Sequence, residues 1–337
     1  EYPLAVAGEF DKEFLELPDE VLITAMREHQ KYFAVINKAR RLLPYFIAVN
    51  NTKARDMKLV ATGHERVLRA RLADAQFFYE GDLEASNNQR VEKLKGVLFQ
   101  AQLGTMYEKT QRVAKIGKFI AKTVDIGLSE ESQENALKAQ VARAAKLCKA
   151  DLVSQVVGEF PKLQGVMGRV YATIARELPT VSAAIEEHYR PTYSGGPLPE
   201  TITGSVLSIA DKIDSICGCF SVGLIPSGTA DPYALRRQGI GIIQIFLAQD
   251  FYFSLSELIS KSLELLGGKA TEDLTATTVK VIGFLQNRVA NLLADEGYSK
   301  GTIAAVLGAN VDVLPDVWLK VNALEVQKAK PDFEPLA

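Results

Sequence analysis

The segment 205–220 constrains the fold of this chain more than any other part of its sequence. Its apolar residues recur at the three- and four-residue spacing of an α-helix and cover a wide face: Val206, Ile209, Ala210, Ile213, Ile216, Cys217 and Phe220. A helix with so broad an apolar stripe must be covered by other elements of the protein. The segment therefore predicts a helix packed inside a helical domain.

The first 80 residues have a different pattern. Short runs rich in β-branched and aromatic residues occur at 21–23, 32–36 and 45–49, and polar turn-forming segments separate them. This is the pattern expected for buried strands. A helix is then expected to begin near His64. Its apolar stripe would consist of Leu68, Leu72, Ala75 and Tyr79.

From about residue 86 onward the sequence predicts helices almost throughout. Ser86 opens a polar break with helix-capping residue types. The segment 141–157 is expected to form a helix whose apolar face carries Val141, Ala144, Ala145, Cys148 and Leu152. Residues 191–199, rich in proline and glycine, predict a loop, and the glycines at 267–268 and 297 predict breaks between later helices.

These patterns together predict a mainly α fold in three parts. An α+β portion is expected over residues 1–85, a helical domain over 86–235, and a second helical domain, which acts as a linker, over 236–337. A chain of 337 residues is long enough for two or three domains.

Composition excludes several classes of protein. The net charge is -2, so any contact with nucleic acid must come from local patches of basic residues. Cys148, Cys217 and Cys219 are too few and too irregularly spaced for a disulfide framework or a zinc site, and we expect ordinary thiols. The apolar run 240–248 is too short to span a bilayer. These features favour a cytoplasmic location.

The segment Asp231-Pro-Tyr-Ala-Leu-Arg-Arg237 combines a turn, a helix start and two adjacent arginines. It resembles a motif, Asp-Pro-(Phe/Tyr)-x-Leu-Arg-Arg, that is typical of the β subunit of bacterial glycyl-tRNA synthetase. Further segments agree with that family and follow its order: Leu-Pro-Asp-Glu-Val-Leu-Ile-Thr at 17–24, Glu-His-Gln-Lys-Tyr-Phe at 28–33, the segment 65–79, Lys-Ala-Asp-Leu-Val at 149–153, Gly-Glu-Phe-Pro at 158–161 and Leu-Gln-Gly-Val-Met-Gly at 163–168.

The resemblance implies a fragment of glycine–tRNA ligase, an assembly of α and β subunits that joins glycine to its cognate tRNA with ATP. The expected partners are the α subunit and tRNA(Gly), with no membrane. The α subunit would use ATP and Mg, so no cofactor and no catalytic residue are expected here, and we expect the chain alone to be inactive. The sequence contains neither a Gly-x-x-x-x-Gly-Lys-Ser/Thr loop nor Gly-x-Ser-x-Gly. The full subunit is expected to continue at both ends.

The helical domain also resembles the HD superfamily, whose members bind metal through a His-Asp pair, an earlier histidine and a later aspartate. The counterpart of the pair is Ala150-Asp151, the early segment 107–113 contains no histidine, and the final carboxylate is kept as Asp211. A further histidine, His188, falls on an apolar stripe. We therefore expect a degenerate domain without metal, in which Asp151, His188 and Asp211 form a vestigial cluster. This cluster is either a residual metal or phosphate pocket or a polar contact that fixes helix packing.

Candidates for RNA binding are the basic residues Arg66, Arg69, Lys31, Arg236 and Arg237. Arg66 and Arg69 lie away from the apolar stripe of their helix, where they would contact phosphates or form a solvated face. Two other functions stay open from the residues alone. They are a metal-dependent phosphohydrolase of the HD type and a purely structural module that holds the α subunit.

Overall fold

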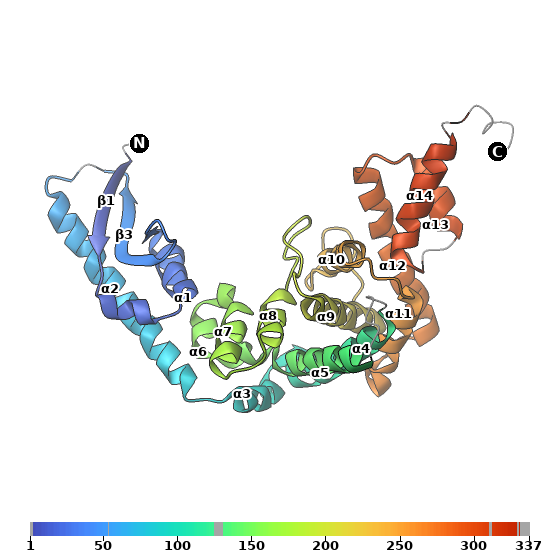
Figure 1. The fold of residues 1–337 in the computed structure, drawn as a ribbon, viewed down its shortest axis with the longest axis horizontal. Helices are drawn as coiled ribbons and strands as arrows, with labels where there is room; N and C mark the ends of the chain where they lie inside the picture. The colour runs from blue at the N-terminus through green and yellow to red at the C-terminus, as the bar shows by residue number, and fades with distance from the viewer. Residues whose placement is uncertain (1–2, 53, 125–130, 310–311, 329, 331–337) are drawn as a thin grey trace.

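The computed structural model describes residues 3–52, 54–124, 131–309, 312–328 and 330. The elements form an arc, with a small sheet and a long helix at one end and the last helices at the other (Figure 1). Most elements are helices, and the one larger sheet lies at the N-terminal end. The predicted fold class, mainly α with an N-terminal α+β portion, is therefore confirmed. The domain boundaries stay a prediction.

The N-terminal sheet has three antiparallel strands in the order β1-β3-β2, namely β1 (Leu4–Glu9), β3 (Leu42–Asn50) and β2 (Phe33–Ile36). Strands β2 and β3 confirm two of the three predicted runs. The third prediction, a strand at 21–23, is wrong, because these residues lie in helix α1 (Asp19–Thr24). Pro18 precedes this helix and acidic residues occupy its first turn, where they suit the helix dipole.

The sheet is buried on one face rather than on both. Along β3, buried Phe46 and Ala48 alternate with exposed Tyr45, Ile47 and Val49. Helix α2 (Met57–Leu83) packs beside β1, and its residues Leu68, Leu72 and Ala75 are fully buried, as predicted. The helix begins earlier than expected because the Asp56 carboxylate caps it, accepting hydrogen bonds from the amides of Lys58 and Leu59.

The end of α2 is joined to the helical part through Asp82. This buried carboxylate accepts hydrogen bonds from the amides of Gln155 (2.8 Å) and Val156 (3.0 Å) and from the Tyr171 hydroxyl (2.7 Å). It therefore caps α6 (Gln155–Glu159). Residues 156–171 share the hydrophobic core of the N-terminal sheet, although they fall inside the predicted helical domain.

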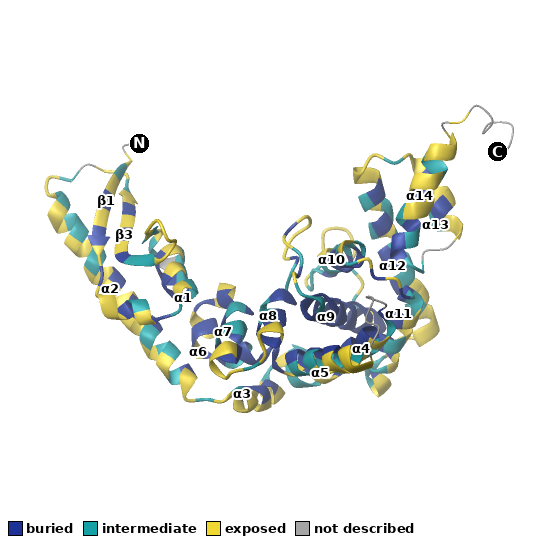
Figure 2. Cartoon of the chain, viewed as in Figure 1, coloured by how far each residue is buried: buried dark blue, intermediate teal, exposed yellow. Residues whose placement is uncertain are grey.

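Helix α9 (Ile202–Ser221) is the centre of the larger core. All of its residues from Thr203 to Ser221 are buried, so the predicted stripe has become a helix covered on every side (Figure 2). Five helices pack against it: α4 (Met106–Thr123), α8 (Pro179–Glu187), α10 (Leu235–Ala248), α11 (Leu255–Glu264) and α12 (Leu274–Asp295). The other helices are α3 (Asn87–Lys93), α5 (Glu131–Leu147), α7 (Val166–Ile174), α13 (Lys300–Ala309) and α14 (Leu314–Lys328). Two short strands, β4 (Leu98–Gln100) and β5 (Gly104–Thr105), pair with each other. Short helical turns lie at Lys12–Glu16, Ala25–His29, Leu94–Gly96, Ala150–Val153, Pro161–Leu163 and Gly267–Lys269.

The predicted helix over 141–157 is only partly correct. Val141, Ala144, Ala145 and Cys148 are fully buried, but α5 ends at Leu147, and a short turn over Ala150–Val153 leads into α6. Ser154 starts α6 because its hydroxyl accepts a hydrogen bond from the Val157 amide. The break places Lys149 and Asp151 in a turn between helices rather than on a helix face.

Candidate lysine pocket

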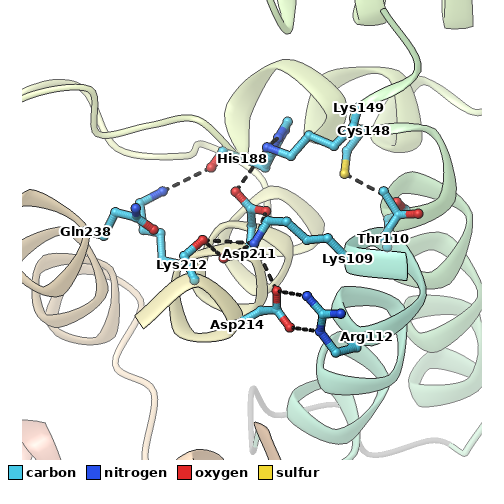
Figure 3. Close-up of polar contacts among 12 residues, drawn as sticks. Lys109, Thr110, Arg112, Cys148, Lys149, His188, Asp211, Lys212, Asp214 and Gln238 are labelled. Atoms are coloured by element: carbon cyan, nitrogen blue, oxygen red, sulfur yellow. Dashed lines mark hydrogen bonds and ion pairs between the residues drawn. The ribbon is translucent and has the colours of Figure 1, made fainter. Parts of the chain in front are cut away.

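A pocket of about 340 Å3 lies between the start of α4, the end of α8, α9 and the start of α10. The charged and imidazole side chains that line it are Lys109, Lys149, His188, Asp211, Lys212 and Arg237. Figure 3 shows that Lys109, Lys149, His188 and Asp211 point toward one another from different elements. Asp211 and Lys212 come from the buried helix α9, so the rest of the helical core fixes their positions.

Two lysines engage the carboxylate of Asp211. Lys149 Nζ lies 3.1 Å from Oδ2, and Lys109 Nζ lies 3.2 Å from Oδ1. Burial alone raises the pKa of this carboxyl, but Lys109 and Lys149 outweigh burial and hold its pKa well below the usual range. Asp211 is therefore ionised and paired with buried ammonium groups.

His188 is neutral and has a defined tautomer. Its Nδ1 lies 2.6 Å from the Ile185 carbonyl oxygen, which can only accept, so Nδ1 carries the proton. Nε2 then accepts a hydrogen bond from Lys149 Nζ at 2.8 Å. Complete burial and the charge of Lys149 lower the pKa of His188 well below its ordinary value.

Two of the three residues of the predicted vestigial cluster, His188 and Asp211, are brought together because Lys149 contacts both. Asp151 is engaged separately, since its Oδ2 accepts hydrogen bonds from the amides of Gly165 (2.6 Å) and Gly168 (3.1 Å). Burial raises the pKa of Asp151 to about 6.

The arrangement of these side chains does not suit a divalent cation, because the Lys149 ammonium lies between the His188 nitrogen and the Asp211 oxygen. Among the described residues, no group of three His, Cys, Asp or Glu side chains is placed to hold a metal ion.

Behind the pocket lies a fully buried carboxylate, Asp214. It is held by Lys109 Nζ at 3.1 Å and by Arg112 through Nε at 2.7 Å and Nη2 at 3.1 Å. The sequence reasoning missed Lys109, Arg112, Lys149 and Lys212. A usable signal existed for the first two, because they share one face of α4 with the buried residues Val113 and Ile116.

The predicted RNA-binding residues lie on separate parts of the molecule. Arg66 and Arg69 are exposed on α2, and Arg69 Nε lies 2.9 Å from Asp11 Oδ2. Lys31 is exposed in the turn before β2, and its Nζ donates a hydrogen bond to the Glu28 carbonyl oxygen. Far from these, at the first turn of α10, Arg236 is half-buried and Arg237 is exposed beside the pocket (Figure 1).

The predicted helix start near residue 231 is confirmed, and the Asp231 side chain caps this helix. Both carboxylate oxygens of Asp231 accept backbone hydrogen bonds, from Leu235 at 2.8 Å and from Arg236 at 2.9 Å. This cap fixes the first turn of α10 and so positions Arg237 at the edge of the pocket.

The three cysteines lie in the larger hydrophobic core. Cys148, Cys217 and Cys219 are buried and free. Burial raises the pKa of Cys148 and Cys217 to about 12 and that of Cys219 to about 11, so all three are protonated and unreactive at neutral pH.

Comparison with known proteins agrees with the motifs in the sequence. A family model described as glycyl-tRNA synthetase beta subunit matches residues 1–308. The chain belongs to this family. Among curated proteins, it is similar along its whole length to the glycine–tRNA ligase beta subunits of Desulforapulum autotrophicum (55% identity), Desulfatibacillum aliphaticivorans (52%) and Geotalea uraniireducens (50%). The chain covers 48% of each of these relatives, which is about half of their length.

Within the described part of this family member, no helix combines the length and the apolar character needed to cross a membrane. The apolar segment 240–248, which the sequence analysis judged too short for a bilayer, belongs to α10, one of the helices packed on α9.

Replacing His188 with Gln should change the acid sensitivity of folding. The folded-state pKa of His188 lies well below 6.5, so as the pH falls below 6.5 the unfolded wild-type chain takes up a proton here that the folded chain does not. Wild-type stability then decreases relative to that of His188→Gln, by up to about 1.4 kcal/mol per pH unit. Urea unfolding of both proteins between pH 7 and pH 5 measures this difference.

The raised pKa of Asp151 has the opposite effect on stability, because the folded chain binds that proton more tightly than the unfolded chain does. This contribution is common to both proteins, so it cancels in the difference. A difference that does not vary with pH would show that His188 is not held neutral.

Proposed function

We propose that this chain is a non-catalytic part of glycine–tRNA ligase that supports tRNA(Gly) and the α subunit. Bond chemistry with ATP and Mg would take place on the α subunit. The observation that carries this proposal is the match of the family model to residues 1–308, together with the similarity of the whole chain to beta subunits. Such an assembly would work in the cytoplasm.

The lysine pocket supports a non-catalytic role over the alternative of an HD-type phosphohydrolase. Hydrolysis of that type requires carboxylates and imidazoles that are free to bind a metal ion. Here Lys149 engages both His188 and Asp211, and Lys109 engages Asp211 as well. The degenerate HD-like domain is therefore best regarded as a support for the helical core.

RNA binding separates this role from that of a purely structural module. In the native assembly, replacing both Arg66 and Arg69 with Ala should weaken tRNA binding and reduce the dependence of log K on log salt by about one unit per lost phosphate contact. Both side chains are exposed, so the fold should be unaffected. The ion pair of Arg69 with Asp11 is exposed and weak, so RNA can displace it. Filter binding across a range of salt concentrations provides the measurement.

A matched control is available on α4. Lys115 and Lys118 are exposed and have the same three-residue spacing and the same charge. Their double Ala variant should bind tRNA with an unchanged salt dependence. If the two double variants behave alike, Arg66 and Arg69 form only a solvated face and the RNA surface lies elsewhere.

A further inference from the structure

The lysine pocket carries an excess of positive charge. Among the described residues that line it, Lys109, Lys149, Lys212 and Arg237 face one carboxylate, that of Asp211. The three lysines are 2%, 4% and 5% exposed. Buried charges are costly unless they are paired. Asp214, behind the pocket, pairs with Lys109 and also with Arg112, so Asp211 and Asp214 together still carry fewer charges than the cations around them. The lining therefore suits an anion.

The pocket also retains hydrogen-bond donors for such a ligand. Arg237 is exposed at its edge, and within the described chain it forms no ion pair, so its guanidinium is available. Lys149 Nζ uses two of its three N–H groups on His188 and Asp211 and lies 4.0 Å from the centroid of the Tyr189 ring. An arginine fork and a lysine ammonium that line one pocket are a suitable donor set for phosphate oxygens.

Lys212 is one of the pocket's buried cations, and burial is the main influence on its pKa. Its ammonium is held by the carbonyl oxygens of His188 (3.0 Å) and Arg190 (2.8 Å). Burial, together with the nearby charges of Lys149, Lys109 and Arg237, lowers its pKa to about 7, although Asp211 acts in the opposite direction. An added anion would offset this repulsion.

We propose that the lysine pocket binds a terminal phosphate group, carried either by a small molecule or by the end of an RNA strand. A phosphodiester within a strand is flanked by sugars on both sides, which keep it away from ammonium groups as deeply buried as these. A terminal phosphate carries a substituent on one side only, so it can enter the pocket more deeply. The volume of about 340 Å3 is in the range of small-molecule sites. This site goes beyond the support role proposed above and does not depend on it.

Titration calorimetry with inorganic pyrophosphate at low salt tests the proposal. We expect binding at one site per chain. Arg237→Ala and Lys149→Met should each weaken it about tenfold through loss of a charge-assisted contact, whereas Asp211→Asn should strengthen it because it removes the opposing charge. Lys118→Ala, an exposed change elsewhere on α4, should have no effect. Circular dichroism checks the fold of each variant, and the opposite sign expected for Asp211→Asn keeps the test valid if Lys149→Met unfolds.

A second pair of probes identifies the source of the phosphate. A short RNA oligonucleotide with a 5′-phosphate is compared with the same oligonucleotide ending in a 5′-hydroxyl, each as a competitor of pyrophosphate. Competition by the phosphorylated form alone supports an RNA end, and competition by neither supports a small molecule. The proposal is overturned if pyrophosphate does not bind, if all variants bind it equally, or if both oligonucleotides compete with it to the same extent. None of these probes involves tRNA or the α subunit, so the outcome is independent of the proposed function.

Discussion

Asp214→Ala should lower the free energy of unfolding by about 3–5 kcal/mol, the usual cost of removing one partner from a buried ion pair. Asp214 is fully buried and holds two cations, Lys109 at 3.1 Å and Arg112 at 2.7 Å. Without it, the Arg112 guanidinium has no carboxylate among its contacts in the described chain, and Asp211 is the one carboxylate there that still contacts Lys109. The loss should appear as a lower midpoint of urea unfolding.

Two further variants make this expectation specific. Asp214→Asn keeps the shape and part of the hydrogen bonding but loses the charge, so it should fall between the wild type and Asp214→Ala. Glu264→Ala breaks an exposed pair with Lys261 and should change stability by less than about 0.5 kcal/mol. If Asp214→Ala costs no more than Glu264→Ala, the buried network does not stabilise the helical core in the way that its geometry indicates.

The sequence predicted most of the helical core because long apolar stripes have few alternatives. The stripe of residues 205–220 became α9, and the stripe at Leu68, Leu72 and Ala75 became the buried face of α2. Short apolar runs do not by themselves distinguish a strand from a helix. Val21-Leu-Ile fits a strand or one turn of helix equally well, and the choice of α1 follows from Pro18 and the two acidic residues after it.

The site was predictable only in part. Asp211 was identified through the resemblance to the HD superfamily, and His188 through the same resemblance together with its place on an apolar stripe. The lysines of the pocket were not identified, because a lysine on a helix is normally expected to face solvent. Their burial becomes visible only in the tertiary fold. Lys149 and Asp211 are 62 residues apart, and Lys109 and Asp214 are 105 apart, so no local pattern connects them.

The second large effect that we expect concerns activity. The chain alone should form no glycyl-adenylate, because activation requires a site that holds Mg and the triphosphate of ATP. Mg in such sites is bound by carboxylate oxygens that are free to coordinate it. In the lysine pocket, Asp211 is paired with Lys109 and Lys149, and Asp214 behind it is paired with Lys109 and Arg112. Neither carboxylate is free to take this role.

Glycine-dependent ATP–pyrophosphate exchange shows whether this chain activates glycine. It should be measured for the purified chain, for the α subunit, and for the native assembly that contains both. We expect no exchange above background for the chain alone and full exchange for the assembly. The opposite result would be exchange by the chain alone that rises in proportion to its concentration and is abolished by Asp211→Ala in a variant that remains folded. That result would show that this chain itself activates glycine.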